Sequence, residues 1–177
     1  MDLWRISVGY RNGNVIDLSG LQSILYHSSS LNWNRLDFPD YLMDNQPQLK
    51  RLDDQFKFGT AFDLGINTRI KAPFYLNIHY QSSLIFPNFE ILKYSGSAIG
   101  ELLIQRGLDY LNYEYGYLDP TLFPIINWLA KGAVSYLLYS ARESNSYYPF
   151  KGSQALRLHS FNIGINLLLK STSREIN

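Results

Sequence analysis

The sequence predicts a β-rich protein with a helical insertion, built on an antiparallel sheet of long strands. Residues 56–70 and 73–86 alternate apolar and polar side chains over about 14 positions each, against the usual ~5–6 residues of a soluble strand. The same alternation recurs near both ends of the chain, and two helical patterns lie between the third and the last predicted strand. A length of 177 residues suits one domain, 1–177.

The first predicted strand spans residues 3–11, where four apolar side chains share one face: Trp4, Ile6, Val8 and Tyr10. The Asn-Gly pair that follows predicts a turn. Residues 15–30 do not alternate, and their leucine and isoleucine spacing predicts a short helix. Residues 31–55 are rich in Asn, Asp, Gln and Pro, which predicts a loop with a helical turn at 47–55.

The next two strands, 56–70 and 73–86, are joined by a short turn at Lys71-Ala72-Pro73. Alternate side chains of a strand point to the same face, and here one face is almost entirely apolar. The other face combines glycine and alanine with charged and amide side chains. Its notable polar members are Lys57, Asp63, Asn67, Arg69, Asn77, His79 and Gln81.

Residues 93–142 form the predicted helical segment. An amphipathic helix is expected at 97–113 with Ser95 or Ser97 as its cap, while three polar side chains lie off its apolar stripe: Glu101, Gln105 and Asp109. A second helix is expected at 120–141, with Asp119 as N-cap before Pro120.

A loop at 144–152 leads to the last predicted strand, 156–170, and a frayed tail. From Phe161 onward the apolar residues of this strand alternate regularly, but Leu156 and Leu158 fall on the opposite phase. This change of phase near Ser160 predicts a β-bulge.

The long alternating strands favour a wall with lipid on one side and water on the other. Lipid requires a continuous apolar stripe, whereas an aqueous lumen accepts glycine, amides and charges. A soluble sheet with one solvated face also alternates. Three features favour the transmembrane β-barrel: the length of the strands, the repetition of the alternating pattern, and the placement of the short turn opposite the long connections. In such a barrel the seven polar residues named above are the predicted lumen-facing residues.

Four segments carry a resemblance to a known class: "WRISVGYR", "FKFGTAFDLGINTRI", "FYLNIHYQSSLIF" and "SFNIGINLLLK". In these the chain resembles outer-membrane β-barrel proteins of Gram-negative bacteria, in the style of the closing part of uncharacterised Bacteroidota barrels. The resemblance is architectural and covers under half of the chain. It implies the bacterial outer membrane as location, the lipid bilayer as partner, and a structural or passive-transport role as a barrel wall or channel component. Many such barrels end in an aromatic residue, and here a polar tail follows Leu169-Lys170.

Four predicted strands are too few to close a barrel, since the smallest common barrels have eight. The favoured explanation is that the chain is the C-terminal part of an incomplete barrel, as the lack of a signal peptide at its start also suggests. Two alternatives stay open. Identical chains join to close one barrel, or further strands lie within residues 12–55.

Two other function classes compete with the barrel wall. One is a soluble α+β binding module whose sheet packs against the two helices. The other is an outer-membrane acyl hydrolase that uses serine with His79 or the His159-Ser160 pair. No nucleophile motif supports catalysis, so the chain is not predicted to be an enzyme. An inner-membrane helix at 120–141 is disfavoured because Pro124, Asn127 and Lys131 interrupt it.

Cofactors and nucleic acid are not predicted as partners. The chain has no cysteine, and its three histidines show no metal-ligand spacing. Its net charge is +1, without a cluster of Lys and Arg. Aromatic residues make up 15% of the chain and charged residues only 18%, a composition that fits an outer-membrane barrel and also an ordinary aromatic-rich β-protein.

Overall fold

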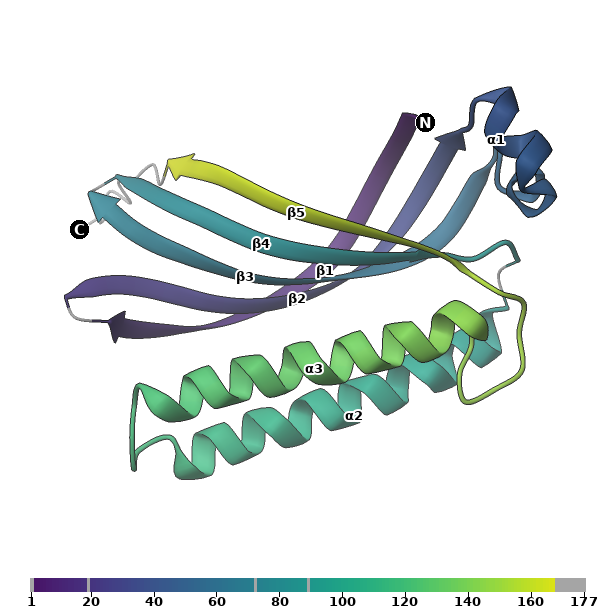
Figure 1. The fold of residues 1–177 in the computed structure, drawn as a ribbon. Coiled ribbons are helices and arrows are strands. Elements are labelled where there is room, and N and C mark those ends of the chain that lie inside the picture. The colour runs from purple at the N-terminus through teal and green to yellow at the C-terminus, as the bar shows by residue number, and fades with distance from the viewer. Residues whose placement is uncertain (1, 19, 72, 89, 168–177) are drawn as a thin grey trace, which may run out of the picture.

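The computed structural model describes residues 2–18, 20–71, 73–88 and 90–167, and its core is a five-stranded antiparallel sheet. The strands follow one another in chain order, so every connection joins neighbours (Figure 1). Their bounds are β1 Asp2–Leu18, β2 Leu21–Asp37, β3 Phe56–Lys71, β4 Phe74–Ile85 and β5 Leu156–Leu167. Within the described part β1 and β5 do not pair with each other, so the sheet is open.

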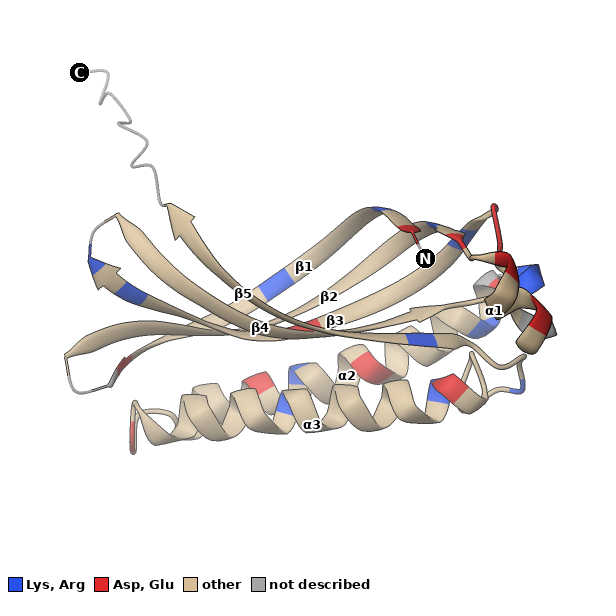
Figure 2. Ribbon diagram, turned by 45° about the horizontal axis from the view of Figure 1, so that its top comes forward, with Lys and Arg blue, Asp and Glu red and all other residues tan. Residues whose placement is uncertain are grey.

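The helices lie at two places on this sheet. The helix α2 (Ile91–Tyr115) and the helix α3 (Leu122–Ser144) form a hairpin between β4 and β5, under the convex side of the bowed sheet (Figures 1 and 2). The short helix α1 (Asp40–Asn45) and the 3₁₀ turn η1 (Pro47–Arg51) follow β2 at one end of the sheet. A β-rich fold with a helical insertion is confirmed. In the described residues no helix combines the length and the apolar character needed to cross a membrane.

The prediction of a helix and a loop over residues 15–37 was wrong, because this region forms the end of β1 and all of β2. The predicted turn at Asn12-Gly13 is also wrong, since these residues pair in register with His27 and Tyr26. The chain instead turns at Gly20, where φ is +85° and the backbone N–H donates to Asp17 Oδ1 at 2.7 Å. Strand β2 fails to alternate because its central residues are buried on both faces of the sheet.

Both predicted helices are present, but the first was predicted too short at both ends, and the second was predicted to begin and to end too early. Helix α2 begins at Ile91, so Ser95 and Ser97 lie inside it and do not cap it. Helix α3 begins at Leu122 with Thr121 as its N-cap, so the prediction of Asp119 as N-cap and Pro120 as the first helical residue was wrong. Asp119 Oδ1 does accept hydrogen bonds from the backbone N–H groups of Thr121 and Leu122, at the start of the helix. The helical turn expected within 47–55 is confirmed as η1.

The predicted bulge near Ser160 was wrong, because β5 pairs with β4 without any shift in register. Leu156 and Leu158 do share a face with the polar residues, but they pack against a small core that includes Leu36 and Ile85. Leucines from η1 and its flank complete this core. Local burial therefore explains the change of phase. Positions 168–170 of the predicted strand and the tail fall outside the described residues.

Candidate functional site

All seven predicted lumen residues lie on one face of the sheet, the concave face turned away from the α2–α3 hairpin. The register shows this directly, since Asp63 pairs with Gln81, Asn67 with Asn77 and Gly65 with His79. Lys57 lies near the start of β3, and its Nζ donates to the backbone oxygen of Pro87 at 3.2 Å. Arg69 lies at the far end of β3, beside a shift in the β3–β4 register.

A chain of hydrogen bonds crosses the concave face from β1 to β4. The Asp63 carboxylate accepts from Ser28 Oγ and from Gln81 Nε2, each at 2.6 Å. Gln81 Oε1 in turn accepts from Arg5 Nη1 at 3.0 Å, and Arg5 Nε donates to Asn34 Oδ1 at 2.8 Å. Four strands are thus joined by side chains as well as by their backbone ladders. Charge-assisted bonds of this kind are stronger than neutral ones.

A second group of hydrogen-bonded side chains on the concave face joins β2 to β5. Asn77 Nδ2 donates to Asn67 Oδ1 at 2.6 Å and to Tyr26 Oη at 3.0 Å, while Asn77 Oδ1 accepts from His79 Nδ1 at 2.7 Å. Asn162 Nδ2 then donates to His79 Nε2 at 3.3 Å. These two groups of residues are called the polar concave face below. The structure brings together the predicted residues of this face on β3 and β4. The residues of this face on β1, β2 and β5 were not predicted from the sequence.

The lack of a side chain at Gly65 leaves room for the Tyr26 ring on the polar concave face. A Cβ at Gly65 would lie 2.4 Å from Tyr26 Cζ and 2.7 Å from His79 Cβ. We expect Gly65→Val to destabilise the protein by about 1–3 kcal/mol, because a buried ring must move and its bond to Asn77 is lost. Gly164→Val is the matched control on β5, where a Cβ meets nothing within 4 Å. Urea unfolding of both variants checks this, and equal midpoints would contradict it.

The interface between the hairpin and the sheet is polar at its centre. Lys131 Nζ lies 2.5 Å from Asp109 Oδ1, which also accepts from Asn12 Nδ2 on β1. Ser135 Oγ shares a 2.9 Å hydrogen bond with His27 Nε2 and accepts from Gln105 Nε2 at 3.0 Å. The polar stripe of α2 is therefore turned inward.

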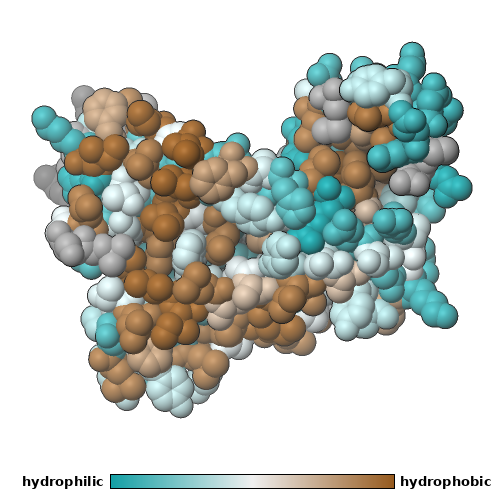
Figure 3. Space-filling model, in the orientation of Figure 1, coloured by the Kyte–Doolittle hydropathy of each residue, from teal (hydrophilic) through white to brown (hydrophobic). Residues whose placement is uncertain are grey.

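The outer side of the hairpin is apolar. Exposed leucine and isoleucine side chains cover both helices, among them Ile99, Leu103, Ile126, Leu129 and Leu137. In Figure 3 brown atoms gather over the hairpin and the neighbouring strands, whereas teal atoms gather near α1. The hairpin thus has its polar side against the protein and its apolar side outward, the reverse of a water-soluble amphipathic helix.

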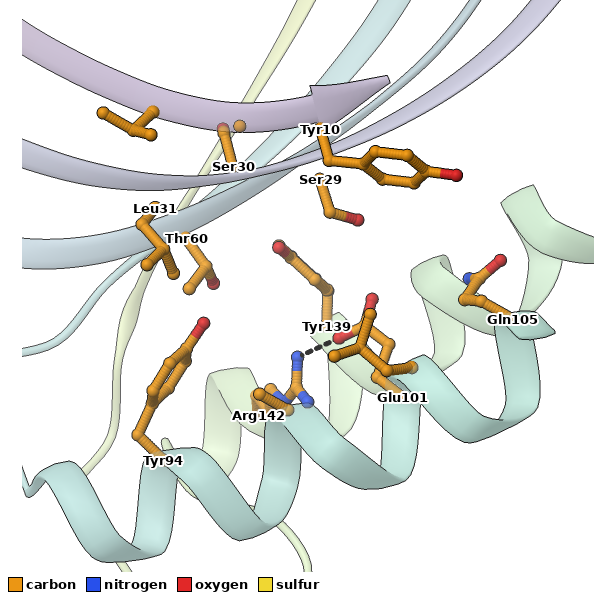
Figure 4. A pocket seen from close by; sticks show the side chains of 14 residues that line it. Tyr10, Ser29, Ser30, Leu31, Thr60, Tyr94, Glu101, Gln105, Tyr139 and Arg142 are labelled. Atoms are coloured by element: carbon orange, nitrogen blue, oxygen red, sulfur yellow. Dashed lines mark hydrogen bonds and ion pairs between the residues drawn. The ribbon is translucent and has the colours of Figure 1, made fainter. Parts of the chain in front are cut away.

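A cleft of about 390 Å³ lies between α2, α3 and the strands β1 and β2 (Figure 4). Its volume falls within the range of ~300–1,000 Å³ seen for small-molecule sites. The exposed side chains of Val8, Tyr10 and Leu102 line its outer part. The buried side chains of Glu101 and Arg142 lie at its base (Figure 4). These two form an ion pair with 2.6 Å between Arg142 Nη1 and Glu101 Oε2.

Two tyrosines in the cleft are held in their neutral form. Burial raises the pKa of Tyr94 to about 12, although nearby Arg142 opposes the shift. Burial also raises the pKa of Tyr139 well above its usual value, and the charge of Glu101 adds to this. Both hydroxyl groups therefore remain uncharged at an alkaline pH at which an exposed tyrosine ionises.

The serine and histidine residues considered for hydrolysis are not arranged as a catalytic pair. His79 is held by Asn77 and Asn162, and His159 Nδ1 lies 2.5 Å from Tyr80 Oη. Ser160 neighbours His159 in the strand and therefore points to the opposite face. The hydrogen-bonded pair of His27 on β2 and Ser135 on α3 is buried between the sheet and the hairpin. Across the ranges that the structure describes, no group of three or more potential metal ligands occurs.

Comparison with known proteins finds no matching family model, no matching curated protein and no matching solved structure.

Proposed function

We propose that the chain forms part of the wall of a bacterial outer-membrane β-barrel, with a structural or passive-transport role. The polar concave face then borders an aqueous lumen. The convex side of the sheet, together with the outer side of the α2–α3 hairpin, faces lipid.

The observation that carries this proposal is the apolar character of the outward-facing surface. On the convex side of both edge strands large apolar side chains are exposed, with Val8 at 66%, Ile163 at 67% and Ile165 at 70%. The outer side of the hairpin continues this surface. Soluble monomers rarely expose apolar patches beyond a few hundred Å², and larger ones mark contact with lipid or with another protein.

The two open edges of the sheet support the same proposal. Strand β1 has 17 residues and β5 has 12, and in the described part each is paired on one side only. Long unpaired edges are templates for further strands, and a closed barrel removes them. Additional strands of the same barrel, or identical chains, would pair at these edges.

A pair of arginine variants on β5 tests the orientation in lipid. Ile165 lies on the convex side, and Asn166 lies beside it on the concave side, where its Nδ2 donates to Asn67 Oδ1 at 3.1 Å. In a bilayer Ile165→Arg is expected to cost about 2–4 kcal/mol, because the charge enters hydrocarbon. Asn166→Arg is expected to cost under about 1 kcal/mol, since it loses one exposed hydrogen bond.

The measurement is the folded fraction in phospholipid vesicles against urea, read from heat-dependent gel mobility and protease protection. If both variants fold equally well, or the chain remains in the supernatant without detergent, the barrel-wall proposal fails. Either result would favour the second candidate, a soluble α+β binding module. One observation supports the soluble module: the hairpin packs on the apolar side of the sheet, where Leu64 contacts Gly132 and Phe62 contacts Tyr139.

A further inference from the structure

The cleft beneath β1 and β2 changes in character from its mouth to its base. Exposed apolar side chains of Val8 and Leu102 line the mouth, on β1 and α2. At the base the side chains of Glu101 and Arg142 are 11% and 3% exposed. A molecule that fits this gradient has a polar head that enters first and an apolar chain that trails outward.

The base presents two hydrogen-bond acceptors that no described residue satisfies. Glu101 Oε1 and Gln105 Oε1 are both buried without a donor. Gln105 is 9% exposed, and its amide nitrogen is already engaged with Ser135. The two residues are four apart on α2, so both oxygens lie on the same side of the helix. Unsatisfied buried acceptors are costly, and a bound donor removes that cost.

The charges of the base exclude anionic heads and disfavour cationic ones. Each of the three guanidinium nitrogens of Arg142 already donates, to Ser97 Oγ, to Ser97 O and to Glu101 Oε2. The ion pair is neutral as a unit. An anionic head would meet the free carboxylate oxygen, and a cationic head would compete with Arg142 for Glu101. An uncharged donor, such as a hydroxyl group, satisfies both acceptors without adding charge.

We propose that this cleft binds one single-chain lipid with an uncharged, hydroxyl-bearing head, of the monoacylglycerol type. The hydroxyl groups donate to Glu101 and Gln105, and the acyl chain lies along Val8 and Leu102. This binding site goes beyond the proposed wall function and does not depend on it, since the residues that line the cleft all come from α2, α3, β1, β2 and β3 of this chain.

Photolabelling tests the site with a monoacylglycerol that carries a diazirine on its acyl chain. The full chain in detergent is labelled, and monolaurin, lauric acid and laurylamine are compared as competitors. We expect saturable labelling of α2 and β1 that monolaurin suppresses at the lowest concentration. Labelling that does not saturate, or lauric acid or laurylamine competing as well as monolaurin, would overturn the proposal.

Two variants locate the site, and a third serves as a matched control. Ala98→Phe fills the cleft and is expected to abolish labelling, whereas Ala133→Phe places the same ring on the exposed side of α3 and is expected to leave it unchanged. Gln105→Met removes one acceptor while keeping the ion pair, and it is expected to weaken monolaurin competition about fivefold.

The control also reports on a rival site, because Ala133 lines a shallow apolar groove between α3 and the sheet. Labelling that survives Ala98→Phe but is lost in Ala133→Phe would assign the lipid to that groove and overturn the proposal. Circular dichroism of each variant confirms that it is folded, and Gln105→Met gives an independent result if Ala98→Phe does not fold.

Discussion

Replacing Arg142 with methionine is expected to destabilise the protein by about 3–5 kcal/mol. The guanidinium is 3% exposed and joins α3 to α2 through Ser97 and Glu101. Without it the Glu101 carboxylate stays in the interface with neither of its oxygens paired. The cost of an isolated buried charge exceeds that of losing an exposed ion pair, which is ~0–1 kcal/mol.

The double variant Arg142→Met with Glu101→Gln separates charge from packing. Because it leaves no uncompensated charge, we expect it to recover more than half of the lost stability. Arg35→Met is the matched single control, since Arg35 pairs with Asp54 on the surface, where both side chains are more than half exposed. Urea unfolding in detergent, followed by tyrosine and tryptophan fluorescence, gives the three free energies. If Arg142→Met lowered the free energy of unfolding no more than Arg35→Met does, the buried ion pair of Arg142 and Glu101 would contribute nothing to stability.

The strands that were predicted from the sequence are those with a clear difference between their two faces. Along β3 the side chains from Phe56 to Ile70 separate into an apolar convex side and a polar concave side, so period two is visible. Strand β2 gives no such signal. Its convex side carries His27 and Ser29 beneath the hairpin, and its concave side carries Tyr26 and Asn34. Mixed chemistry on both faces hides the period.

The polar concave face and the cleft also differ in how far the sequence predicts them. The seven polar residues of β3 and β4 were predicted together because a hairpin keeps them close in sequence. Their partners Arg5, Ser28 and Asn34 come from strands whose pairing depends on long-range contacts. The cleft was not predicted, since its base depends on α2 lying under β1 and β2. A signal existed in the polar spacing of Ser97, Glu101, Gln105 and Asp109, which marks the inward side of α2.

Phe62→Ala is expected to cost about 3–5 kcal/mol, the range for a large aromatic lost from a core. Phe62 is 1% exposed and belongs to a buried cluster that also contains Leu84 of β4 and Tyr139 of α3. Its ring meets Tyr139 edge-on, with 4.8 Å between centroids, and lies 5.9 Å from the ring of Tyr80. These two rings come from α3 and from β4, so we expect the hairpin to loosen first at this point.

The control is Phe56→Ala, on the same strand and the same side of the sheet but 59% exposed. Its expected cost is under about 1 kcal/mol, because truncating an exposed side chain leaves no cavity. Limited proteolysis within residues 116–121, which connect α2 to α3, reports detachment of the hairpin separately from global unfolding. If Phe62→Ala lowered stability without faster cleavage there, the ring would be stabilising the sheet and not the attachment of the hairpin.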